Sequence, residues 1–227
     1  MKKFGFTLAE VLVTLGIIGV ISAMTIPSLS TNANNKANAA KLSATISTLE
    51  TAISNLMADE GVVDFYDIDR EDYIEKIPKY IKLSKLEHED LGDNYKEDLD
   101  GSDNNFGKTI DGKSGITDTE FKIGGMPYLL KNGAYVQIEE IQRIFIDTNG
   151  DAKPNIFGRD MHYFKLSTEG KLLAYGSRAL VDYTKDNTQD KAEYWSTSTD
   201  KLYACNDSKK GLGCTGRLIE NNFVIDF

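Results

Sequence analysis

The feature that most constrains this chain is one long apolar stretch near its beginning. Residues 6–29 carry a single ionisable side chain, Glu10, and nothing else in the 227 residues is comparably apolar. As an α-helix this stretch would be about 36 Å long, enough to cross the hydrocarbon core of a bilayer. Lys2 and Lys3 precede it and predict that this end stays in the cytoplasm.

A secretory signal peptide is the alternative explanation of such a beginning, and Ile21-Ser22-Ala23 resembles a weak cleavage site for it. Glu10 argues against this, because a carboxylate in an apolar segment costs about 3 kcal/mol or more. A cut between Gly5 and Phe6 would explain the charge. It creates an α-amino group on Phe6, and in a polymer this amine can neutralise the Glu10 carboxylate of a neighbouring subunit.

These residues resemble the prepilin cleavage and methylation signature of type IV pilins and type II secretion pseudopilins, in Gly5-Phe6-Thr7-Leu8-Ala9-Glu10, the apolar run with Gly19, and Pro27. In that family prepilin peptidase cuts after the glycine and N-methylates the new terminal phenylalanine. Ala9 departs from the pattern, which more often has a bulky aliphatic residue there. The resemblance implies a subunit whose partners are prepilin peptidase, other pilin or pseudopilin subunits and the inner-membrane assembly platform.

A second helical half is predicted beyond Pro27, which itself should kink the helix by removing a backbone donor. One apolar face recurs at spacings of four and three, through Leu42, Ile46, Leu49, Ile53 and Leu56. Gly61 is a plausible end of this helix. A coiled coil with a partner could use the same face, but the run covers only about two heptads, so packing against the chain's own sheet is favoured.

The rest of the chain predicts an antiparallel sheet. Strands are expected at residues 128–131, 134–138, 143–146, 162–166 and 171–175, and Asn132-Gly133 is a type I′ hairpin signal. Residues 70–90 read as short helical stretches interrupted by Pro78, and residues 92–118 as a long polar surface loop. The predicted fold is α+β: a long N-terminal helix on a sheet of three to five strands, the pilin-like layout that the resemblance also implies.

The predicted organisation has four parts: a cleaved leader at 1–5, a transmembrane and polymerisation helix at 6–29, an amphipathic half of the same helix at 30–61, and a periplasmic α+β domain at 62–227. The chain would cross the cytoplasmic (inner) membrane once, with the domain periplasmic or extracellular. After assembly it would lie in a pilus or pseudopilus.

Two cysteines, Cys205 and Cys214, lie near the C-terminus. A disulfide is the default for a domain outside the cytoplasm. A metal pair is the alternative, but the spacing is not the short one of zinc sites. Gly211, Gly213 and Gly216 formally match a dinucleotide fingerprint, yet too little chain follows them for the helix and acidic residue that such a site needs.

A loop between two predicted strands is rich in side-chain oxygens, from Asp147, Asn149, Asp151, Asn155 and Asp160. Such a set suits calcium, which takes about six to eight oxygens. The EF-hand pattern fails, because the glycine is misplaced and Gly158 stands where the bidentate glutamate should be. Major pseudopilins bind calcium in a loop of this domain, so the resemblance supports a calcium site. A polar turn that ends a strand is the alternative.

The composition sets limits on function. A net charge of -9 argues against nucleic acid as a partner. No arrangement of a nucleophile with a base is visible, so no enzymatic activity is expected. The predicted function is a structural subunit of a type II secretion or type IV pilus system, and the calcium-like loop favours secretion. The alternative is a membrane-tethered periplasmic ligand-binding domain that does not polymerise.

Overall fold

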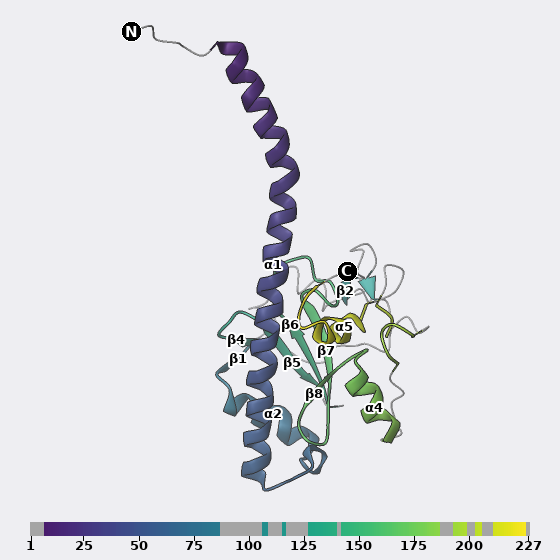
Figure 1. Ribbon diagram of the computed structural model, residues 1–227. Helices are drawn as coiled ribbons and strands as arrows, with labels where there is room; N and C mark the ends of the chain where they lie inside the picture. The colour runs from purple at the N-terminus through teal and green to yellow at the C-terminus, as the bar shows by residue number, and fades with distance from the viewer. Residues whose placement is uncertain are drawn as a thin grey trace.

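The computed structural model describes residues 7–86, 106–108, 115–116, 127–139, 142–186, 193–198, 203–205 and 211–225. One long helix, α1, runs along one side of a globular head and projects far beyond it (Figure 1). The elements are α1 (Leu8–Glu60), η1 (Phe65–Asp67), α2 (Arg70–Tyr80), β1 (Leu83–Lys85), β2 (Phe106–Lys108), β3 (Gly115–Ile116), β4 (Tyr128–Leu130), β5 (Tyr135–Glu139), β6 (Arg143–Asp147), β7 (Met161–Leu166), β8 (Leu172–Ala174), α4 (Arg178–Asp186) and α5 (Cys214–Glu220). The predicted α+β class is confirmed.

Helix α1 is continuous through Pro27 and is gently curved (Figure 1). It ends where the sequence predicts, because Gly61 takes the left-handed conformation with φ of 68°. The Gly61 N–H donates to the carbonyl of Ala58 at 3.2 Å, and the N–H of Val62 donates to that of Met57 at 3.0 Å. These bonds satisfy carbonyls that the last helical turn leaves without partners.

The main sheet has six antiparallel strands in the order β1-β4-β5-β6-β7-β8. The five predicted strands are confirmed as β4 to β8, each to within one residue at either end. Strand β1 was missed, because it directly follows a helical segment and pairs with β4, which is distant in the sequence. The predicted interruption at Pro78 is wrong: α2 continues to Tyr80, and a proline so close to a helix end removes little hydrogen bonding. Of residues 92–118, the described part forms a second sheet, in which β2 pairs with β3.

The β4–β5 turn differs from the predicted type I′ turn. The register pairs Leu129 with Tyr135, so three residues form the loop instead of two. Only Gly133 has a positive φ, of 81°, and its N–H donates to the carbonyl of Leu130 at 2.9 Å. A type I turn closed by a left-handed glycine is the usual form of three-residue hairpin loops, and it explains why Asn132 stays at negative φ.

Polar contacts join the second half of α1 to two hairpins. The Asn132 side chain, in the β4–β5 turn, donates to the buried Thr45 hydroxyl at 3.0 Å. The backbone N–H of Leu172 donates to Glu50 Oε1 at 3.0 Å, and Lys171 forms an ion pair with Glu50 Oε2 at 3.2 Å. Between these contacts the predicted apolar face packs on the sheet: Leu42, Leu49, Ile53 and Leu56 are fully buried, and Ile46 is partly buried.

The opposite face of the sheet carries a second, aromatic core. Tyr135, Phe145, Tyr163 and Tyr175 pack there with residues from the loops that follow β6 and β8. The Tyr163 hydroxyl donates to the carboxylate of Glu139 at 2.6 Å, and burial raises the pKa of that carboxyl. Both faces of the central strands are therefore buried, so the head has a complete core without the N-terminal half of α1.

Candidate membrane-anchoring and polymerisation segment

The N-terminus of α1 is closed by a capping box between Thr7 and Glu10. The backbone N–H and the hydroxyl of Thr7 both donate to Glu10 Oε2, each at 2.8 Å. In return the N–H of Glu10 donates to the Thr7 hydroxyl at 3.3 Å. We did not predict this role of Thr7 from the sequence, although a threonine three residues before a glutamate at the start of an apolar helix is its known signal.

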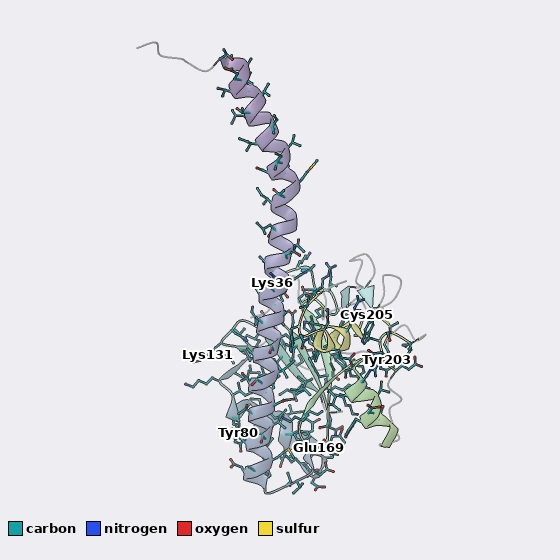
Figure 2. All side chains as sticks on the ribbon, viewed as in Figure 1. Lys36, Tyr80, Lys131, Glu169, Tyr203 and Cys205 are labelled. Atoms are coloured by element: carbon teal, nitrogen blue, oxygen red, sulfur yellow. A yellow bond between two sulfur atoms is a disulfide. The ribbon has the colours of Figure 1, made fainter. Side chains whose placement is uncertain are left out.

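The first half of α1 leaves its apolar side chains exposed on every side. They project from the helix with none of the drawn side chains of the head packed on them, whereas the side chains below Lys36 meet the head (Figure 2). The exposed residues include Leu8, Leu12, Val13, Leu15, Ile17, Ile18, Val20, Ile21, Met24, Ile26 and Leu29. Among the described residues α1 is the one helix long and apolar enough to cross a membrane.

The predicted processing and assembly residues lie at or near this end. Glu10 is in the first turn of α1, and Pro27 is inside the helix. Gly5 and Phe6 lie outside the described residues. The structure therefore brings Glu10 together with Thr7, and the proposed pairing of Glu10 with the Phe6 amine of another subunit stays a prediction.

The acidic loop after β6 is held by its own backbone amides. Asp147 Oδ1 accepts the N–H groups of Asn149 and Gly150, at 3.0 Å and 2.9 Å. The buried Asp160 carboxylate accepts the N–H groups of Asn155 and Ile156 and, at 3.1 Å, the side-chain amide of Asn149. Burial raises the pKa of Asp160 to about 6, against the lowering effect of these hydrogen bonds.

The five residues predicted to bind calcium do not form a ready-made metal site. Where the chain is described, no three acidic, histidine or cysteine side chains are grouped to hold a metal ion. Donors inside the loop already use both oxygens of Asp160. Calcium binding by Asp147, Asn149, Asp151, Asn155 and Asp160 stays a prediction, and titration of the head with millimolar calcium in a calorimeter would test it. Absence of heat would contradict it.

The C-terminal cysteines are joined in the structure. Cys205 and Cys214 form a disulfide, and both are buried with the half-buried Trp195 against them. Glu220 holds the neighbouring aromatic side chains, since its Oε2 accepts the Tyr194 hydroxyl at 2.9 Å and the Trp195 indole N–H at 3.2 Å. The C-terminal segment is thus fastened both covalently and by hydrogen bonds.

The glycines of the formal dinucleotide fingerprint have a packing role. A Cβ atom on Gly213 would lie 1.6 Å from the carbonyl oxygen of Tyr203, and one on Gly216 would lie 2.3 Å from the nitrogen of Ser177. A Cβ atom on Gly176 would in turn lie 2.5 Å from Gly213 Cα. These glycines let the start of α5 approach the end of β8, so the pattern needs no nucleotide to explain it.

Comparison with known proteins gives one match. Residues 1–26 match the family model of the prokaryotic N-terminal methylation motif. No curated protein and no solved structure matches the chain. The match covers Gly5 to Glu10 and Gly19, and it ends one residue before Pro27. The long helix on an antiparallel sheet is a layout consistent with a pilin-like fold. The chain therefore begins with the prepilin-type signature of type IV pilins and pseudopilins.

Proposed function

We propose that this chain is a structural subunit of a pilus or pseudopilus, cut after Gly5 by prepilin peptidase and assembled through the first half of α1. One observation carries the proposal: the exposed, apolar first half of α1 bears a single carboxylate, Glu10, at its first turn. A contiguous apolar surface of this kind marks a membrane or protein interaction site. Lipid would cover it before assembly, and the same helix of neighbouring subunits would cover it afterwards.

The assembly step that we propose is a charge pairing. Cleavage frees the α-amine of Phe6, and the Glu10 carboxylate of a neighbouring subunit accepts it. Within the apolar bundle of helices each charge compensates the other, and removal of either would strand its partner at a cost of several kcal/mol. Helices could approach closely at the small residues Gly16 and Gly19, where an added Cβ atom would meet nothing in the isolated chain.

The proposed orientation places the head outside the cytoplasm. Lys2 and Lys3 lie on the cytoplasmic side by the positive-inside rule. The Cys205–Cys214 disulfide suits an oxidising compartment such as the periplasm. Residues 1–5 would be the leader, 6–29 the membrane and polymerisation helix, 30–61 its amphipathic continuation, and 62–227 the periplasmic domain. The inner-membrane assembly platform would be the partner that receives the processed subunit.

Type II secretion and type IV pilus systems both use such subunits. The length of the chain favours a minor or specialised subunit over a compact major one. Calcium binding, if measured, would favour a secretion pseudopilus. In either system we expect the chain to be the substrate of an enzyme and a building block.

The decisive experiment is the intact mass of the N-terminal peptide of the protein from native membranes. A start at Phe6, with or without one added methyl group, supports the proposal. A retained Met1, or a start near Met24, would contradict it and would favour a tethered or secreted ligand-binding domain. Co-sedimentation of the processed chain with sheared filaments would then separate a polymerising subunit from a monomeric one.

A further inference from the structure

We draw no further inference here: the strongest candidate, the surface patch in which Tyr194 and Trp195 lie beside α5 with an arginine guanidinium over each ring, carries no proposal, because nothing in the described part of the chain shows what covers it.

Discussion

The two halves of α1 have similar apolar side chains but opposite surroundings. Leu12, in the first half, is 60% exposed, whereas Leu49, in the second half, is 0% exposed. The second half packs on the sheet of its own chain, whereas the first half is not buried by any residue that the structure describes. One helix therefore divides its apolar surface between two partners. The second half stabilises the fold of the head, and we propose that the first half contacts the membrane and then the filament.

The strongest test of this division is Glu10→Val. We expect the variant to be cleaved after Gly5 but to lose assembly by a factor of about 100 or more, because an unpaired buried amine costs about 3–5 kcal/mol. Quantification of processed subunits in membranes and in sheared filaments measures both steps. The thermal unfolding of the head should be unchanged. Normal incorporation into filaments would refute the pairing role of Glu10.

A matched pair of leucine substitutions tests whether only the second half of α1 contributes to the stability of the head. Leu49→Ala should lower the free energy of unfolding by about 2–5 kcal/mol, because it opens a cavity between α1 and the sheet. Leu12→Ala should change it by less than about 0.5 kcal/mol, because that side chain is 60% exposed among the described residues. Urea unfolding of the full chain in detergent, followed by the fluorescence of Trp195, gives both values. Similar losses from the two variants would contradict the division.

Acid should lower the stability of the head, because a buried histidine lies on the sheet face that α1 covers. His162 lies 3.4 Å from the Thr215 hydroxyl, and burial lowers the pKa of His162 to about 3, from an ordinary value of 6.5. Below pH 6.5 the unfolded chain therefore binds a proton that the folded chain does not. His162 thus removes about 1.4 kcal/mol of stability for each unit by which the pH falls towards 3.

Asp160 has the opposite effect. Its pKa of about 6, raised above 3.8, makes the folded chain bind the extra proton, so Asp160 adds stability as the pH falls from 6 to 4. The comparison of the natural chain with His162→Gln isolates the histidine. The difference between their unfolding free energies, measured at several pH values from 7 to 4, should change by about 1.4 kcal/mol per unit below pH 6.5. A constant difference would show that His162 does not titrate in this way.

The smallest expected effect comes from a matched pair of threonines. Thr45→Val removes the buried hydroxyl that accepts the Asn132 side chain, and should lower the free energy of unfolding by about 1 kcal/mol. Thr14→Val removes only bonds to carbonyls within the helix itself, and the stability of the head should not change. Thermal unfolding of both variants provides the comparison. Destabilisation of the head by Thr14→Val would mean that the two halves are energetically coupled.

The accuracy of the sequence predictions follows how local each signal is. Patterns among neighbouring residues were enough to predict three features: the apolar face from Leu42 to Leu56, the helix end at Gly61 and the strands β4 to β8. Strand β1 depends for its pairing on β4, which is distant in the sequence, so it was missed. The N-terminal assembly residues depend on a short motif, and Thr7 could have been found from the same motif.

Contacts between distant segments could not be predicted. Gly213 and Gly216 suggested a nucleotide fingerprint, and the reason for them became visible only when Tyr203 and Ser177 were placed against α5. Likewise, an alternation of Asp and Asn does not reveal that Asp160 is enclosed by amides of its own loop. A local pattern gives the kinds of atoms available, and the fold decides what they face.

The contacts of Glu50 also fix the rotation of α1 about its own axis relative to the head. Because Lys171 and Leu172 hold Glu50 on the sheet, α1 cannot rotate about its own axis within the head. Glu10 lies 40 positions earlier in the same continuous helix. In an ideal helix this is about 11 turns and a further 40°, so the two carboxylates leave the axis on nearly the same side, about 60 Å apart. The orientation of the head about the helix axis is therefore fixed relative to the direction in which the Glu10 carboxylate points. Each residue inserted between Glu10 and Glu50 would rotate the head relative to Glu10 by about 100°.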